Sequence, residues 1–204
     1  VSNLKVKKSL RDIFVQLRNE GHKIRSVFLS LKEDSGNNIL GKKMIPLLGK
    51  NSLREFLCEL QYEISPTSFF QVNPWLASLL YRRIEQLVGN VSNKSFVAWD
   101  LYCGVGVISL LLARLGFQVW GIEENPNAIQ NANQNSLINN LSENLDFSCL
   151  DVEKSLFNVP SWASSPKFIV VNPSRKGLGE TIIKQLSLYL LGSHKKTTLI
   201  YVSC

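Results

Sequence analysis

The feature that most constrains the fold of this 204-residue chain is the stretch FVAWDLYCGVGVISLLLARLGFQVWGIEE at residues 96–124. An apolar run leads into Asp100, and a turn containing Gly104 and Gly106 follows. A helical apolar pattern comes next, then a second apolar run that ends in Glu123. Strand, glycine turn, helix, strand and carboxylate in this order predict the first half of a nucleotide-binding α/β domain.

The residues of this turn indicate what kind of cofactor it would hold. Gly104 and Gly106 let the backbone turn sharply and leave room for a cofactor at the helix N-terminus. Glu123 is placed to accept hydrogen bonds from ribose hydroxyls. The third glycine of a dinucleotide fingerprint is missing, which disfavours NAD, whereas a shorter glycine turn suits S-adenosylmethionine. Glycines that serve packing alone are the alternative.

The chain after this stretch continues the alternation of strands and helices. Apolar runs at residues 145–149, 168–171 and 198–203 predict strands, and residues 128–138 and 177–191 predict helices. Such alternation requires a mainly parallel sheet, in which ligands gather at the carboxyl ends of the strands. The polar or reactive residues expected at those ends are Asp100, Glu123, Asp151, Asn172 and Cys204.

The chain before residue 74 has a different character. Residues 13–17, 26–31 and 59–64 are prone to form strands, with a turn at 34–38 and a further strand starting at 38, so residues 1–64 predict a small β-rich domain. Residues 65–73, SPTSFFQVN, form a connector to the α/β domain at 74–204.

A helix is expected to begin at Pro74, with Arg82 and Arg83 exposed. Its apolar stripe, predicted to face the core, consists of Trp75, Leu76, Leu79, Leu80, Ile84 and Leu87.

Charge and composition narrow the class of protein. The net charge is +7: residues 1–64 carry 12 Lys and Arg against 7 Asp and Glu, and residues 65–204 carry 11 against 9. A basic N-terminal part suggests a polyanion partner such as RNA or DNA, with a solvated basic surface as the alternative. The four cysteines lack C-x-x-C spacing, so we expect buried free thiols and no zinc site. The sequence shows neither a signal peptide nor a membrane span, and we expect a cytosolic protein.

The motifs SFFQVN, DLYCGVG, GIEENPNAIQNANQN, NPSRKGL and YVSC occur here in the order found in the RNA uracil-C5 methyltransferases. From about Ile64 to Cys204 the chain resembles this family, with weaker echoes upstream. The resemblance implies a Rossmann-like class I methyltransferase sheet, S-adenosylmethionine as cofactor, and formation of 5-methyluridine in tRNA or ribosomal RNA.

The same resemblance implies roles for individual residues. Gln71 matches the glutamine of the family that contacts the cofactor, and Tyr102 matches the aromatic residue of the glycine-turn motif. Glu123 matches the acid that binds ribose, and Asp151 lies where the family has a residue near the adenine. Together with Asp100, Gly104, Gly106 and Asn172, these residues form the expected cofactor site.

The resemblance also assigns the residues expected to meet the RNA. Asn172 and Arg175 match the D-P-x-R motif between cofactor and base, with Asn in place of the usual Asp. Cys204 matches the catalytic nucleophile. Uracil C5 is a poor nucleophile until a thiolate adds at C6, and a base must later remove the C5 proton. A target uridine would have to leave its stack to reach such a site.

The resemblance covers only part of the family's length. The family continues beyond its cysteine with more strands and a glutamate base, and some members add a β-barrel domain and an iron–sulfur motif. We therefore expect this chain to be a C-terminally incomplete methyltransferase, able to fold but unable to turn over. An exposed sheet edge would then favour self-association.

Three other classes of function stay open from sequence. Asn172-Pro173-Ser174 is similar to the N-P-P-aromatic motif of methyltransferases that act on amines, which need no cysteine. A non-catalytic RNA-binding module that keeps the fold is the second alternative, and an NAD enzyme is a distant third.

Overall fold

The computed structural model describes residues 2–31, 41, 43–89, 96–192 and 196–203. The chain divides into two compact units, one of residues 1–53 with 65–67 and the other of residues 54–64 with 68–204. Residues 54–64 thus belong with the larger unit, and the domain boundary expected at residue 64 stays a prediction. No helix in the part of the chain that the structure describes is long and apolar enough to cross a membrane.

The smaller unit contains a helix that the sequence pattern did not predict. Helix α1 (Ser2–Asn19) contacts strand β2 (Lys43–Gly49), which pairs antiparallel with β1 (Ser26–Leu31). The strand expected at 13–17 is therefore wrong, whereas the strand at 26–31 is confirmed. Leu10, Phe14 and Leu17 lie at helical spacing and are half-buried, which a strand at 13–17 would not achieve. The turn expected at 34–38 and the start of a strand at 38 lie outside the described residues.

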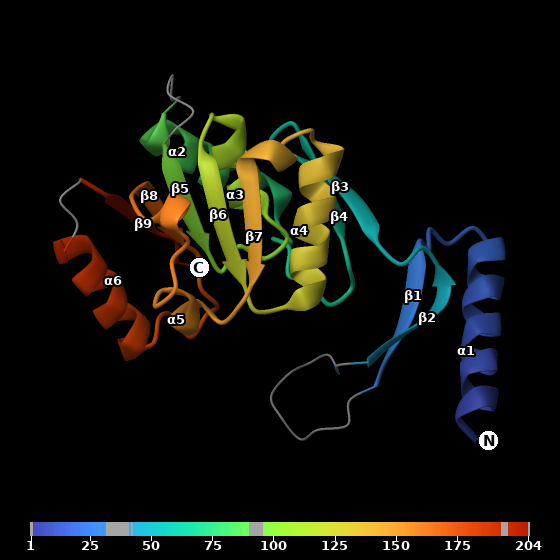
Figure 1. Ribbon diagram of the computed structural model, residues 1–204. Helices are drawn as coiled ribbons and strands as arrows, with labels where there is room; N and C mark the ends of the chain where they lie inside the picture. Colours follow the sequence, from blue (N-terminus) through green and yellow to red (C-terminus); the bar gives the residue numbers. More distant parts are fainter. Residues whose placement is uncertain (1, 32–40, 42, 90–95, 193–195, 204) are drawn as a thin grey trace. The chain divides into compact units, whose positions relative to one another are not determined.

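The larger unit is built on a five-stranded parallel sheet (Figure 1). Its strands are β5 (Val97–Leu101), β6 (Gln118–Glu123), β7 (Leu145–Cys149), β8 (Pro166–Val171) and β9 (Thr198–Tyr201). They lie in the order β7-β6-β5-β8-β9, and every pair is parallel. This confirms the Rossmann-like fold class, with the strand order reversing between β5 and β8.

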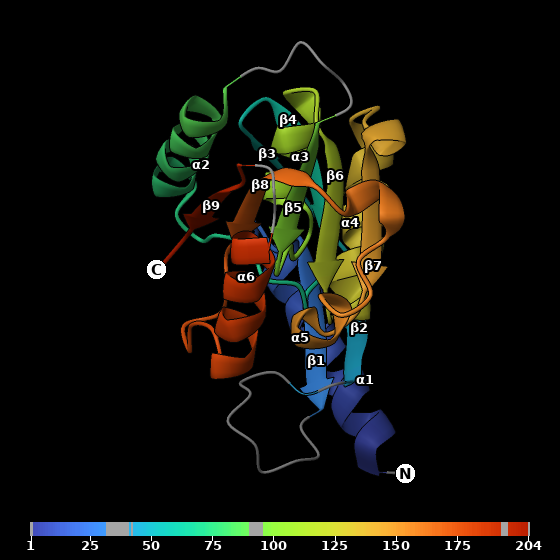
Figure 2. The ribbon, with the colours of Figure 1, turned by 60° about the vertical axis from the view of Figure 1, so that its left-hand side comes forward.

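Helices cover both faces of this sheet, as the turned view in Figure 2 shows. Helices α2 (Pro74–Val88) and α3 (Val107–Arg114) share one core with Ala98 of β5. Helix α4 (Pro126–Ile138) packs beside α3, and on the opposite face α5 (Val152–Ser155) and α6 (Glu180–Gly192) cover Trp99 and Leu101. Alternate residues of β5 therefore enter different cores, as the pleat requires.

Short elements complete the larger unit. Strands β3 (Leu53–Leu57) and β4 (Leu60–Ile64) form a separate two-stranded sheet, and β4 confirms the strand expected at 59–64. Single 3-10 turns lie at Ser142–Asn144 and Ser161–Ala163.

Helix α2 begins at Pro74 as expected, but it buries a different face from the predicted one. Its buried residues are Ala77, Tyr81, Ile84 and Val88. The side chains of Trp75, Leu76, Leu79 and Leu87 are instead exposed, Trp75 by 68%. Of the predicted stripe, Ile84 is buried and Leu80 is half-buried, while Arg82 and Arg83 are exposed as expected. The helical period was right and its phase was wrong: the face that packs into the core shared with α3 is the one that carries Ala77 and Tyr81.

The cysteines also differ from expectation in one case. Cys103 is buried and Cys58 is half-buried, whereas Cys149 is exposed. Cys149 ends β7, which is an edge strand in the described sheet.

Truncating Trp99 tests the core beneath α6. Trp99 is fully buried, donates from its indole N–H to the Ala163 carbonyl at 2.9 Å, and meets the Trp120 ring edge-on at 5.5 Å between ring centroids. We expect Trp99→Ala to lower the free energy of unfolding by about 3–5 kcal/mol in urea denaturation. Trp162→Ala, at a partly exposed neighbour, is the control and should cost less than about 1 kcal/mol. Equal losses would contradict this account of the core.

Candidate cofactor site at the switch point of the sheet

The glycine turn lies directly after β5, at the point where the strand order reverses. The Cys103 N–H donates to the Ile122 carbonyl and the Gly106 N–H to the Cys103 carbonyl, both at 2.9 Å. The first bond ties the turn to β6, and the second closes it ahead of α3.

The two glycines of the turn serve different purposes. Gly106 has φ +84°, and a Cβ there would lie only 3.1–3.2 Å from side-chain atoms of Leu110, Ala132 and Phe147. Gly104 has φ +56°, and a Cβ there would meet no atom within 4 Å. Gly106 is therefore needed for packing and backbone conformation, while Gly104 borders open space where a ligand can approach the backbone.

Glu123, at the end of β6, lies against this turn. Its Oε2 accepts from the Gly104 N–H at 3.2 Å, and its Oε1 accepts from the Asn125 N–H at 2.9 Å. A carboxylate offers about four lone-pair sites, so two backbone donors leave capacity for ligand hydroxyls. The structure thus places Glu123 against the turn, and its role in binding ribose stays a prediction.

Asp100 lies inside β5, one residue before its end, and is fully buried. Its Oδ2 accepts from the Ser109 hydroxyl at 2.6 Å, whereas its Oδ1 has no hydrogen-bond partner among the described residues. Burial raises the pKa of Asp100 to about 7, the Ser109 hydrogen bond opposes this rise, and the charge of Glu123 adds to it. Ser109 occupies the position of the missing third fingerprint glycine, and sequence reasoning gave it no role.

Tyr102 precedes the turn in a left-handed conformation, with φ +65°. Its half-buried side chain packs at the edge of the core beneath α6. Burial is the largest cause that raises the pKa of Tyr102. The negative charges of Glu153, Asp151, Glu124 and Glu123 raise this pKa further. These four carboxylates make the surroundings of Tyr102 acidic, and we call them the acidic rim.

The remaining predicted residues surround the neighbouring strand ends. Asp151 is exposed and caps α5, because its Oδ1 accepts from the Glu153 N–H at 2.9 Å. Asn172 follows β8, and its N–H donates to the Leu101 carbonyl at 3.2 Å. Arg175 is exposed and lines a small cavity of about 40 Å³ together with Tyr201 and Ser203.

The roles of two further predicted residues stay predictions. Gln71 is half-buried in the connector, where the neighbouring Phe70 ring packs on Tyr62 at 5.8 Å between centroids. Its role in cofactor binding stays a prediction. Cys204 lies outside the described residues, so its role stays a prediction too. The described residues contain no cluster of three or more His, Cys, Asp or Glu side chains able to hold a metal.

Comparisons with known proteins agree with this fold. Residues 84–162 match the family model described as tellurite resistance protein TehB. The chain is 35% identical to an uncharacterized RNA methyltransferase of Oceanobacillus iheyensis over 94% of its own length and 40% of the relative. It is 29% identical to one of Fusobacterium nucleatum over 100% of its length and 42% of the relative. The chain therefore spans about two fifths of the curated relatives it matches.

Solved structures give the same picture. The crystal structure of Pyrococcus abyssi tRNA (uracil-54, C5)-methyltransferase with S-adenosyl-L-homocysteine is 29% identical, with a TM-score of 0.67 over 91% of this chain and 43% of that one. A SAM-dependent methyltransferase from Agrobacterium tumefaciens, 17% identical, aligns with a TM-score of 0.54 over 74% of this chain and 47% of that one, which shows shared fold alone.

The raised pKa of Asp100 predicts a pH-dependent stability. Because the folded pKa, about 7, exceeds the ordinary value of 3.8, the native state holds this proton more tightly than the unfolded state. The resulting stability is present below about pH 4 and is lost as pH rises through about 7. Urea unfolding measures this effect. As pH rises from 5 to 8, we expect the free energy of unfolding of Asp100→Asn to increase by roughly 2–3 kcal/mol relative to that of wild type.

The matched control for this measurement is Asp146→Asn, because Asp146 is an exposed carboxylate on β7. The difference in the free energy of unfolding between Asp146→Asn and wild type should not change over the same pH interval. An Asp100→Asn profile parallel to that of wild type would contradict the raised pKa.

Proposed function

We propose that this chain binds S-adenosylmethionine and belongs to an RNA methyltransferase that methylates uridine at C5. The observation that carries the cofactor assignment is the open space at Gly104, beside a Glu123 carboxylate that keeps unused acceptor capacity. The similarity to proteins named RNA methyltransferases supports the RNA target.

The residues present fit this cofactor in shape and in charge. Gly104 leaves the backbone accessible, and Glu123 can accept ribose hydroxyls. The acidic rim suits the cofactor's positive sulfonium and ammonium groups, and it would repel a pyrophosphate, which disfavours NAD. When bound, the cofactor supplies an electrophilic methyl group on sulfur.

The charge distribution supports an RNA partner. Residues 1–53 carry 11 Lys and Arg against 4 Asp and Glu, while residues 54–204 carry 12 of each. The whole net charge of +7 therefore belongs to the smaller unit. Exposed cations such as Lys8, Arg11 and Arg18 along α1 suit phosphate contacts.

The local structure before Cys204 supports its proposed role as nucleophile. The Val202 N–H donates to the Val171 carbonyl at 2.9 Å, so the chain is anchored beside the end of β8 two residues before the cysteine. In the proposed reaction the Cys204 thiolate would add to uracil C6, and C5 would then take the methyl group as its bond to the cofactor sulfur breaks and the bonding electrons stay on sulfur. A base removes the C5 proton, the C6–S bond breaks, and the thiolate is regenerated. The base is not assigned to a residue.

Calorimetric titration with S-adenosylmethionine tests the cofactor site. Wild type should bind, and Glu123→Ala should weaken binding by roughly 10- to 100-fold, because ribose hydroxyls lose a charged acceptor. Glu143→Ala is the control. It removes an exposed carboxylate from the Ser142–Asn144 turn, which precedes the first residue of β7, whereas the candidate site lies at the carboxyl ends of the strands. This variant should leave the affinity unchanged. Equal affinities for all three proteins would refute the role of Glu123.

RNA carrying 5-fluorouridine tests the target atom. Fluorine at C5 cannot leave as a proton does, so the Cys204–RNA adduct should persist after methyl transfer and appear by denaturing electrophoresis and mass spectrometry. Cys204→Ala should abolish the adduct, while Cys149→Ala, at an exposed thiol, should retain it. Methyl transfer to ordinary RNA that survives Cys204→Ala would instead favour an amine target.

A further inference from the structure

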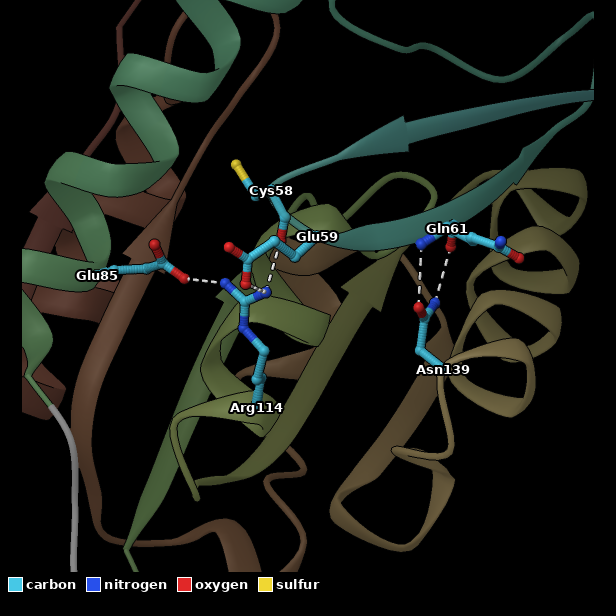
Figure 3. A network of polar contacts seen from close by, with 6 residues as sticks. All are labelled: Cys58, Glu59, Gln61, Glu85, Arg114 and Asn139. Carbon is cyan, nitrogen blue, oxygen red and sulfur yellow. Dashed lines mark hydrogen bonds and ion pairs between the residues drawn. The ribbon is translucent and has the colours of Figure 1, made fainter.

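A row of asparagines on α4 faces β4 and the connector that follows it. Asn131 and Asn135 of α4 and Asn139, its C-cap, are spaced four residues apart and so lie on one side of the helix. Asn139 accepts from the Gln61 N–H at 3.0 Å and donates to the Gln61 carbonyl at 2.7 Å, as Figure 3 shows. Asn131 accepts from the Ser68 hydroxyl at 2.9 Å. Side-chain amides thus pair with β4 as a neighbouring strand would.

Asn135 makes the same contact and one more. Its Oδ1 accepts from the Glu63 N–H at 2.6 Å, and its Nδ2 donates to the Glu63 carbonyl at 3.2 Å. The same Nδ2 donates to the carbonyl of Val105 at 3.0 Å. Val105 lies between the two glycines of the turn, and the Asn135 side chain is fully buried. Both amide hydrogens are thereby used, one on β4 and one on the glycine turn.

The β3–β4 hairpin, with which these amides pair, is itself held in place by side chains. It forms its own two-stranded sheet outside the five-stranded one, so side chains hold it in place. Arg114 at the end of α3 forms an ion pair with Glu85 of α2, lies 3.7 Å from Glu59, and donates to the carbonyl of Cys58 (Figure 3). The hairpin is therefore fixed at its turn by Arg114 and along β4 by the asparagines.

We propose that Asn135 is a positioning residue for the cofactor, holding the glycine turn at Val105 against β4 in the conformation that binds S-adenosylmethionine. This inference rests on the proposed function, because it concerns the same site. Inside the turn the Gly106 N–H donates to the Cys103 carbonyl, and the Val105 carbonyl is oriented from outside the turn by the Asn135 amide. Without the bond from Nδ2, the buried Val105 carbonyl would lose a partner, and turn conformations that do not bind the cofactor would gain population.

Asn139 offers a matched control within the same helix. As the C-cap of α4 it lies one turn further on, forms the equivalent pair of hydrogen bonds with β4 and also donates to the Asn135 carbonyl at 2.8 Å. Among the described residues no hydrogen bond joins it to the glycine turn. Asn135→Ala and Asn139→Ala therefore both remove an amide from β4, and only the first removes the bond to Val105.

Binding of S-adenosylhomocysteine by calorimetry is the first measurement. We expect Asn135→Ala to weaken the affinity about tenfold, the size of one lost buried hydrogen bond, while Asn139→Ala stays within about twofold of wild type. Thermal unfolding of both variants identifies any loss that comes from general destabilisation.

A spectroscopic signature separates positioning from stability. The sequence contains two Val-Gly pairs, Val88-Gly89 and Val105-Gly106, so protein labelled with carbonyl-¹³C valine and ¹⁵N glycine gives two resolved peptide signals. Asn135→Ala should move the Val105 carbonyl resonance and leave that of Val88 in place. Asn139→Ala should move neither.

The outcomes distinguish this inference from the proposed function. A wild-type chain that binds no S-adenosylhomocysteine refutes the proposed function, and the Val105 signal still decides whether Asn135 holds the turn. If wild type binds and the two variants weaken binding equally, or if the Val105 signal is unchanged in Asn135→Ala, the positioning role is wrong.

Discussion

The candidate site depends on how the turn at residues 102–106 is held in one conformation. Tyr102, Gly104 and Gly106 all have positive φ, which glycine adopts readily and tyrosine does not. The hydrogen bond from the Gly106 N–H to the Cys103 carbonyl closes the turn, and further bonds reach it from outside. The Ile122 carbonyl and the Glu123 carboxylate hold one side of it, and the Asn135 amide holds the other. Residues from β6 and α4 thus determine whether the site exists.

The polar side chains of this site differ in how many of their donors and acceptors are hydrogen-bonded within the protein. Glu123 accepts two backbone N–H groups, and Asn135 uses both of its amide hydrogens. Asp100 accepts the Ser109 hydroxyl, yet one buried oxygen lacks a partner among the described residues. A buried acceptor without a donor is costly, and its cost appears here as a raised pKa. The stability given up at Asp100 is the kind of local cost that folded proteins concentrate at binding sites.

The sheet and most of the strand ends could be predicted because they depend on local pattern. The order strand, glycine turn, helix, strand placed Gly104 beside Glu123, and the structure has them hydrogen-bonded. The helix α1 and the buried face of α2 could not be read in this way, because both depend on which of several apolar faces meets another element. The role of Asn135 was hidden for a related reason. Its partners, Glu63 and Val105, are distant in sequence.

Charge separation between the two units constrains how an RNA substrate could meet the proposed site. The larger unit is neutral overall, and its site carries the acidic rim around Tyr102, whereas all net positive charge lies in residues 1–53. Phosphate groups are attracted to the cations and repelled by the rim. The acidic rim would therefore repel an RNA backbone, the exposed Arg175 after β8 would attract it, and a single base, which carries no charge, could pass the rim. A nucleotide turned out of its stack satisfies both conditions, since it separates its base from the neighbouring phosphates.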